Sequence, residues 1–315
     1  MAPLIARSFF NTNSIYKTTM KLKTLFVAAA VSLAAFVANP LLAQCAAGAV
    51  KKDIALQLYS LRDMFKKDYE TAMKTVGEMG YTAVEAAGYA GGKFYGQAPE
   101  KFKADVEKYG MKVLSSHTAK ALSDKELKTK DFSESLKWWD DTIAAHKAAG
   151  MEYIVMPWMP TPKTVEDLDT YCKYYNAVGK KCKDAGLKFG YHNHAFEFQK
   201  IENKEMMYDY LIKNTDPDLV FFEMDVYWVV RGQNSPVEYF KKYPNRFQML
   251  HIKDHKELGE SGMVGFDAIF KNIEPSGAKH LVVEVERYDF APEVSVKKSL
   301  EYLQKAPFVK ESYNK

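Results

Sequence analysis

Short apolar runs alternate with longer segments of helical spacing along most of this 315-residue chain. The apolar runs predict eight strands, at residues 54–59, 81–85, 112–116, 153–156, 188–193, 219–225, 247–252 and 280–285. After each strand, apolar residues recur at helical spacing and predict helices at 62–79, 99–109, 134–149, 164–185, 205–213, 236–243, 266–273 and 292–304. Strands that alternate with helices indicate a parallel sheet, and eight such units predict a (β/α)₈ TIM barrel in one domain.

The beginning of the chain has the pattern of a secretory signal. Lys21 and Lys23 precede an apolar run of about 14 residues, and small residues follow around Ala43. A membrane-spanning helix needs roughly 20 apolar residues, so this run is too short to span a bilayer. We therefore expect a signal peptide at residues 1–43, with Met20 as an alternative start.

Removal of this segment would leave a barrel domain at residues 44–315 that is exported, either to the periplasm or out of the cell. Cys45 raises the alternative of a lipid-anchored protein. Gln44 is a poor residue to precede a lipidated cysteine, so this alternative is less favoured.

The charge balance limits the expected partners. The chain has 44 basic and 40 acidic residues, and four basic but no acidic residues lie in the first 43 positions, so the exported chain would carry 40 of each sign. A phosphate backbone favours a basic surface. We therefore expect no nucleic-acid partner and no membrane span, while assembly into a homo-oligomer stays open.

Several of the apolar runs end in carboxylates or histidines, as in HNHAFEF (192–198), FFEMDVYW (221–228), LHIKD (250–254) and VVEVE (282–286). Side chains alternate between the two faces of a strand, so Glu223 and Asp225 share one face while Phe222 and Met224 share the other. Ionised groups are seldom fully buried unless they are paired or bind a metal. The four strand ends are therefore predicted to converge on one divalent cation.

The candidate ligands lie at the carboxyl ends of the last strands, which is the end where TIM barrels carry their active sites. They are Asp225, His251, Glu284 and Glu197, with His192 and His194 as alternatives to Glu197. Carboxylate and imidazole ligands suit Mn²⁺, Mg²⁺, Co²⁺ or Zn²⁺ and do not choose among these ions.

Such a site suits the removal of a proton from a carbon next to a carbonyl group, because a bound cation stabilises the enediolate that develops. The candidate catalytic residues are Glu284 as the base, with His192, Lys253 and His117 as further candidates. An ion pair of Lys253 with Glu284 or Glu286 is the alternative to its catalytic role. The candidate substrate-binding residues, at strand ends and in loops, are Trp228, Arg231, His194, Glu85 and Trp158.

These motifs, together with IALQLYSLRD and GYTAVEAAGY, resemble the xylose isomerase-like TIM-barrel superfamily of sugar (phosphate) isomerases and epimerases, over residues 54–303. In the related ketose 3-epimerases the metal ligands are Glu, Asp, His and Glu, and by resemblance the last three fall on Asp225, His251 and Glu284. His192 stands where that family has a glutamate, and Trp228 stands where it has a substrate-binding histidine. Both departures weaken the expectation of direct epimerase activity.

The sequence thus leaves three functions open. The first is a divalent-metal-dependent sugar isomerase or epimerase. The second is a lyase or hydratase that acts on 3-keto-glycosides by the same enolate chemistry. The third is a non-catalytic carbohydrate-binding barrel. A DNA-repair enzyme similar to endonuclease IV is disfavoured by the expected export and by the balanced charge.

Overall fold

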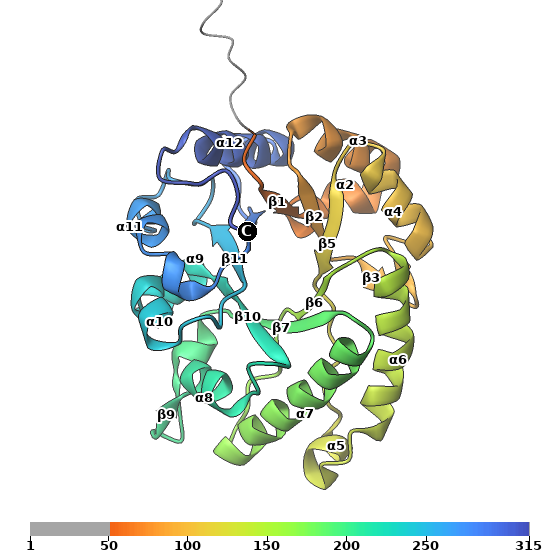
Figure 1. Cartoon of the computed structure of the whole chain (residues 1–315), viewed down its shortest axis with the longest axis vertical. Coiled ribbons are helices and arrows are strands. Elements are labelled where there is room, and N and C mark those ends of the chain that lie inside the picture. Colours follow the sequence, from red (N-terminus) through yellow and green to blue (C-terminus); the bar gives the residue numbers. More distant parts are fainter. Residues whose placement is uncertain (1–50, 315) are drawn as a thin grey trace, which may run out of the picture. The chain divides into compact units, whose positions relative to one another are not determined.

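The computed structural model describes residues 51–314, and the expected signal peptide at 1–43 lies outside this range. Eight parallel strands form a ring at the centre of the molecule, and helices surround it (Figure 1). The strands are β1 (Ala55–Gln57), β2 (Ala83–Ala86), β5 (Lys112–Ser116), β6 (Tyr153–Met156), β7 (Lys188–His192), β10 (Val220–Asp225), β11 (Met249–Lys253) and β12 (His280–Glu284). Their order around the sheet is β5-β2-β1-β12-β11-β10-β7-β6.

The two end strands of this order, β5 and β6, also meet. The amide of Glu152 donates to the carbonyl of Leu114 at 3.1 Å, and the amide of Thr118 donates to the carbonyl of Val155 at 2.9 Å. These bonds join the two ends of the sheet. The predicted (β/α)₈ barrel is therefore confirmed.

Helices and short hairpins connect the strands. The longer elements are α2 (Arg62–Lys67), α3 (Tyr69–Met79), α4 (Pro99–Glu107), α5 (Asp124–Thr129), α6 (Ser133–Ala148), α7 (Val165–Asp184), α8 (Met207–Asn214), α9 (Val226–Arg231), α10 (Pro236–Lys242), α11 (Phe266–Lys271) and α12 (Pro292–Lys305). The shorter ones are the 3-10 turns η2 (Leu58–Leu61), η3 (Phe196–Phe198) and η4 (Glu274–Ser276), and the hairpins of β3 (Tyr89–Ala90) with β4 (Lys93–Phe94) and of β8 (Lys200–Ile201) with β9 (Glu205–Met206).

The predicted elements do not all match the structure. The helix expected at 62–79 is divided at Asp68, whose backbone is extended and whose carboxylate accepts from the amide of Thr71 at 3.2 Å. A side chain that caps a helix start in this way begins a new helix. Between β2 and α4, residues 88–96 contain the β3–β4 hairpin, which was not among the predicted elements. Its turn uses positive φ angles of 55° and 78° at Gly91 and Gly92.

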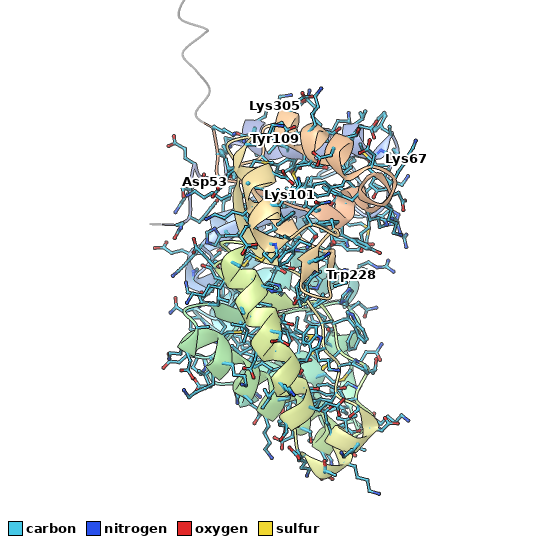
Figure 2. All side chains as sticks on the ribbon, turned by 90° about the vertical axis from the view of Figure 1, so that its right-hand side faces the viewer. Asp53, Lys67, Lys101, Tyr109, Trp228 and Lys305 are labelled. Carbon is cyan, nitrogen blue, oxygen red and sulfur yellow. The ribbon has the colours of Figure 1, made fainter. Side chains whose placement is uncertain are left out.

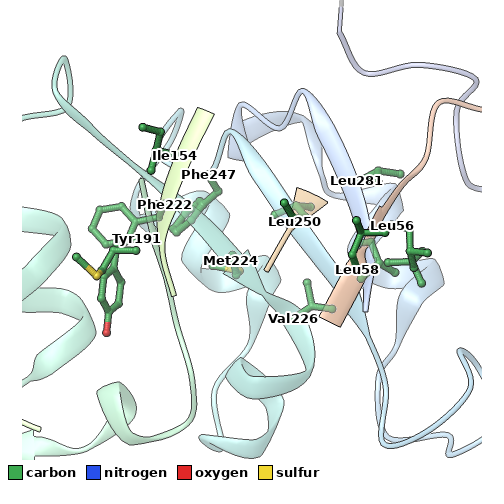
Figure 3. Packing of buried hydrophobic residues seen from close by; sticks show 14 of the residues in the cluster. Leu56, Leu58, Ile154, Tyr191, Phe222, Met224, Val226, Phe247, Leu250 and Leu281 are labelled. Carbon is green, nitrogen blue, oxygen red and sulfur yellow. The ribbon is translucent and has the colours of Figure 1, made fainter. Parts of the chain in front are cut away.

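The strands bury apolar side chains on both of their faces. Phe222 and Met224 of β10 point outward and pack with residues such as Leu250 between the strands and the helices (Figure 3). The inward-facing apolar residues form a separate cluster inside the barrel, made of Ala55, Leu114, Tyr153, Val155, Phe221, Met249 and Val282. Along β10 the inward side continues from Phe221 to Glu223 and Asp225, as the alternation predicted. A dry apolar floor therefore lies beneath the polar strand ends.

The two ends of the barrel are chemically different. Asp53, which precedes β1, and Trp228, which follows β10, lie toward opposite sides of the molecule (Figure 2). The carboxylates and histidines at the strand ends lie toward the side of Trp228. Within residues 51–314, none of the helices combines the length and the apolar character that a bilayer span requires.

Gly179 lies in α7 where this helix packs against the start of β10. A Cβ atom at this position would lie 2.3 Å from the carbonyl oxygen of Leu219, a backbone atom that cannot rotate away. We expect Gly179→Ala to lower the free energy of unfolding by about 1–3 kcal/mol, because the helix must move outward. Urea denaturation followed by circular dichroism measures this change.

Lys183→Ala, on the exposed side of the same helix, is the matched control. It should change the free energy of unfolding by less than about 0.5 kcal/mol. Equal denaturation midpoints for the two variants would show that α7 does not depend on this close approach.

Candidate active site

Four buried side chains from four neighbouring strands meet at the carboxyl end of the barrel: His192 from β7, Asp225 from β10, His251 from β11 and Glu284 from β12. One nitrogen or oxygen atom of each lies within 4.8 Å of those of the other three. Asp225 and His251 lie side by side in the β10–β11 register. We call these four residues the cation group.

The polar atoms of the cation group lie near one another, but they do not form hydrogen bonds with one another. His192 Nε2 lies 3.5 Å from Asp225 Oδ2, and His251 Nδ1 lies 4.0 Å from the same oxygen. His251 Nδ1 also lies 3.6 Å from Glu284 Oε2. Within residues 51–314, His192 Nε2, Asp225 Oδ2 and His251 Nδ1 have no hydrogen-bond partner. Buried polar atoms without partners cost free energy, so these three atoms favour a group that binds among them.

Hydrogen bonds on the far side of each imidazole determine which nitrogen carries the proton. His192 Nδ1 lies 3.2 Å from the carbonyl oxygen of Pro157, which can only accept, so Nδ1 is the protonated nitrogen. His251 Nε2 lies 2.7 Å from the carboxylate of Glu85 and donates to it. The surrounding carboxylates raise the pKa of His251 well above its ordinary value, against the effect of burial. A cation would bind each ring at its other nitrogen, His192 Nε2 and His251 Nδ1, in place of a proton there.

Asp225 divides its two oxygens between two tasks. Oδ1 accepts from the amide of Trp228 at 2.9 Å and caps the start of α9. Oδ2 faces His192 Nε2 and His251 Nδ1. Two imidazoles and two carboxylates are a donor set that Mn²⁺, Co²⁺, Zn²⁺ or Mg²⁺ can use, so the residues present fit one divalent cation.

Glu85 lies below the cation group and does not reach the substrate side, in contrast to the predicted substrate contact. It is fully buried, and it accepts from Ser115 Oγ at 2.6 Å and from Gln57 Nε2 at 2.8 Å in addition to His251. Burial opposes ionisation of Glu85, but the neighbouring His117 and the hydrogen bond from His251 hold its pKa at about 2. A carboxylate that holds a ligand imidazole orients that ligand and raises its basicity. Glu85 is therefore a positioning residue for His251.

A second buried carboxylate, Glu223, lies one inward-facing position below Asp225. Its Oε2 lies 2.8 Å from His117 Nε2, whereas its Oε1 has no partner among the described residues. Burial raises the pKa of Glu223 well above its usual value, and the nearby charge of Glu85 adds to this effect. Glu223 therefore supports His117 from within the barrel.

Lys253 forms the ion pairs that were the alternative to its predicted catalytic role. Its Nζ lies 2.8 Å from Glu284 Oε2 and 2.6 Å from Glu286 Oε2, and 5.1 Å from the centroid of the Trp228 ring. Burial opposes the charge of Lys253, but Glu284, Asp225 and Glu286 raise its pKa above the ordinary value. Lys253 therefore acts on the site through Glu284, whose pKa it lowers well below the usual value despite the burial of that carboxyl.

Glu197, the predicted fourth ligand, is not a member of the cation group. It lies in η3, where Tyr191 donates to its Oε1 at 2.7 Å and the amide of His194 donates to its Oε2 at 2.9 Å. Burial raises the pKa of Glu197 to about 8. A carboxyl that is largely protonated at neutral pH is a poor cation ligand, and His192 occupies the fourth position instead.

A cavity of about 470 Å³ opens above the cation group, and we call it the main cavity. Among its lining residues are His117, His192, His194, Glu284 and Trp158. The side chain of Trp158 is 46% exposed, so an aromatic face is available at the wall of this cavity. These five predicted site residues are thus brought together around one space.

Two predicted substrate-binding residues do not line the main cavity. Trp228 does not line the main cavity, because its ring packs between Lys253 and His194, whose ring centroid lies 5.4 Å away. Arg231 lies on the surface at the end of α9, away from the lining. Its position follows from helix α9, which carries it away from the strand end.

Gln57 and Ser115 belong to the site but were not predicted from the sequence. The parallel register places Gln57 beside Glu85 and Glu85 beside Ser115, at one level of the barrel. A signal existed for Gln57, since a polar residue interrupts the apolar run IALQLY at its end. Ser115 carries no such signal, because serine is common in strand ends of every kind.

Comparison with known proteins gives a family match and several relatives. A family model described as xylose isomerase-like TIM barrel matches residues 73–306. A solved structure of a sugar phosphate isomerase/epimerase from Parabacteroides distasonis ATCC 8503 is 37% identical and superposes with a TM-score of 0.75, covering 82% of this chain and 100% of that one.

Two curated relatives are named inosose dehydratase. The protein from Clostridium perfringens is 26% identical over 268 residues, which cover 72% of this chain and 87% of that protein. The protein from Geobacillus kaustophilus is 26% identical over 210 residues, which cover 62% of this chain and 64% of that protein. This chain thus spans just under two thirds of the length of the Geobacillus relative.

Proposed function

Because the chain belongs to the xylose isomerase-like TIM-barrel family, we propose that it is a carbohydrate enzyme that removes a proton from a carbon next to a carbonyl group. The observation that carries this proposal is the convergence of His192, Asp225, His251 and Glu284, of which His192 and Glu284 line the main cavity. When bound, a divalent cation supplies stabilisation of the negative charge that develops on the carbonyl oxygen of the sugar.

The residues of the chain supply the proton transfers. Glu284 lines the main cavity and is ionised, because the charge of Lys253 lowers its pKa well below the usual value, against the effect of burial. An ionised carboxylate is a weak base, and a weak base suffices where the enolate is stabilised. His194 is neutral at pH 7, since burial lowers its pKa to about 3. It can therefore exchange a hydrogen bond with a sugar hydroxyl, as donor or as acceptor.

The fate of the enolate decides the reaction. Return of the proton to the opposite face of the same carbon gives an epimer, and return to the neighbouring carbon gives an isomer. The name of the 37% identical relative, a sugar phosphate isomerase/epimerase, supports this first candidate. A second candidate is elimination of a group from the carbon next to the enolate, and the relatives named inosose dehydratase support it. In elimination the departing group leaves with the electron pair of its bond to carbon and can take up the proton that Glu284 removed. A second base is therefore not needed, which agrees with a histidine rather than a carboxylate at position 192.

Deuterium exchange tests the shared first step. The purified protein is incubated in D₂O with ketoses, aldoses, ketoinositols and 3-keto-glycosides, and NMR measures deuterium at the carbon next to the carbonyl. We expect exchange with at least one substrate, and we expect a chelator to suppress it. A sugar that binds without exchange, across the whole panel, would instead support a non-catalytic carbohydrate-binding barrel.

We further propose that the protein works outside the cytoplasm. The basis is the pattern of Lys21, Lys23 and the apolar run before Ala43. Sequencing of the amino terminus of protein purified from cells should find Gln44 first, and an intact terminus would contradict export by cleavage.

A further inference from the structure

A second cavity of about 360 Å³ adjoins the main cavity, and we call it the side cavity. Tyr59 and Ala87 line both spaces and form the boundary between them. The side cavity therefore continues the space that lies above the cation group.

The side cavity is lined by aromatic rings that are held in place. Phe65 and Tyr95 have ring centroids 4.6 Å apart at an interplanar angle of 31°, and the amide of Ala87 donates to the Tyr95 hydroxyl at 2.8 Å. Arg62 covers the ring of Tyr59, with its guanidinium carbon 4.7 Å from the ring centroid. Rings fixed in this way offer apolar surface to a ligand at little cost in conformational entropy.

Arg62 also ties the side cavity to the wall of the main cavity. Its guanidinium donates to the carbonyl of Glu286 at 3.3 Å and to the hydroxyl of Tyr288 at 2.8 Å. Glu286 itself lines the main cavity. The two spaces thus share one connected wall, although neither a carboxylate nor a histidine lines the side cavity. The side cavity suits a part of the substrate that does not react.

We propose that the substrate is a glycoside rather than a free monosaccharide. The sugar that carries the carbonyl group occupies the main cavity, and a ring attached through the glycosidic oxygen occupies the side cavity against Tyr59 and Phe65. A free monosaccharide that occupies the main cavity would leave the aromatic wall of the side cavity without a ligand. The assignment of the reacting sugar rests on the proposed function, whereas the site for the attached ring rests on the side cavity alone.

Binding measurements test this assignment without turnover. Phenyl and methyl D-glucopyranosides, each as both anomers, are titrated into the protein by calorimetry. Stacking of the phenyl ring in the side cavity should make the phenyl compound bind at least about tenfold more tightly than its methyl counterpart. Cellobiose and maltose, titrated alongside, distinguish a second sugar ring from an aryl group as the preferred attachment.

Variants test whether the aromatic wall of the side cavity causes the preference for phenyl over methyl glucosides. Tyr59 is 42% exposed, so Tyr59→Ala should fold, and it should reduce the preference for phenyl over methyl to about twofold or less. Tyr59→Phe keeps the ring and should keep the preference. Phe290→Ala removes an aromatic ring that is 51% exposed but lines neither cavity, and it should also keep the preference.

Deuterium exchange with the 3-keto forms of the same glycosides distinguishes a failure of the side-cavity site from a failure of the proposed function. Equal affinities for phenyl and methyl glucosides, or a preference that survives Tyr59→Ala, would overturn the side-cavity site even if deuterium exchange occurs. A phenyl preference that depends on Tyr59, without exchange in any 3-keto form, would overturn the proposed function and leave the side-cavity site in place.

Discussion

Asp225→Asn should reduce the rate of deuterium exchange by at least about 1,000-fold and should lower the divalent metal content of the purified protein. The reason is the division of labour between the two oxygens of this carboxylate. An asparagine oxygen can still accept from the amide of Trp228, so the start of α9 is preserved. The charge that faces His192 and His251 is lost. Elemental analysis and the exchange assay measure the two effects.

Glu257→Gln is the matched control for this variant. Glu257 is equally buried, but it accepts from the amide of Asp289 at 3.0 Å and does not line the main cavity. It should keep its metal content and its exchange rate. An Asp225→Asn protein with the metal content and activity of the unmodified protein would refute the role of the cation group.

Lys253→Met should lower the free energy of unfolding of the metal-free protein by about 3–5 kcal/mol, the usual cost of removing one partner of a buried ion pair. The Nζ of Lys253 lies 2.8 Å from Glu284 Oε2, so the change removes the positive charge beside this carboxylate. The cost is large because the side chain of Lys253 is only 2% exposed, and water cannot replace the lost partner. A divalent cation in the cation group would replace part of that charge. Thermal unfolding with and without added Mn²⁺ should therefore show a larger gain for the variant than for the unmodified protein.

Lys242→Met provides the comparison with an exposed pair. Lys242 lies 2.8 Å from Asp209 Oδ2, but its side chain is 51% exposed, so its removal should cost less than about 1 kcal/mol. If Lys253→Met were as stable as Lys242→Met, the pair with Glu284 would not hold that carboxylate in its ionised form.

The predicted ligands that proved to lie together are those whose position depends on strand alternation alone. Asp225, His251 and Glu284 are the inward-facing residues at or near the ends of consecutive strands of the sheet, and period-two alternation together with the carboxyl-end rule is enough to bring them together. The fourth position could not be chosen in this way. After His192 the chain leaves β7 and turns into η3, so alternation no longer says where Glu197 points.

Glu85 and Lys253 illustrate two other limits. The register between β2 and β5 shifts between Val84 and Glu85, and a bulge of this kind re-aims a side chain without any mark in the hydrophobic pattern. Lys253 lies beside Glu284 only because β11 and β12 pair in one particular register. The pattern within a single strand therefore predicts neither the contact of Glu85 with His251 nor that of Lys253 with Glu284.

The amino-acid sequence by itself determined the eight strands of the barrel and their order, most of the longer helices, and the strand ends at which acidic and imidazole groups gather, because these depend on local periodicity. It did not predict the division of the helix at 62–79, the short helices α5 and α9, or the two hairpins. The tertiary structure alone decided that His192 and not Glu197 completes the cation group, that Glu85 holds His251 from below, and that Tyr59 separates two adjoining cavities. These features depend on contacts between residues far apart in the chain, whose geometry is set by strand register, by a bulge and by the packing of loops, and no local pattern encodes them.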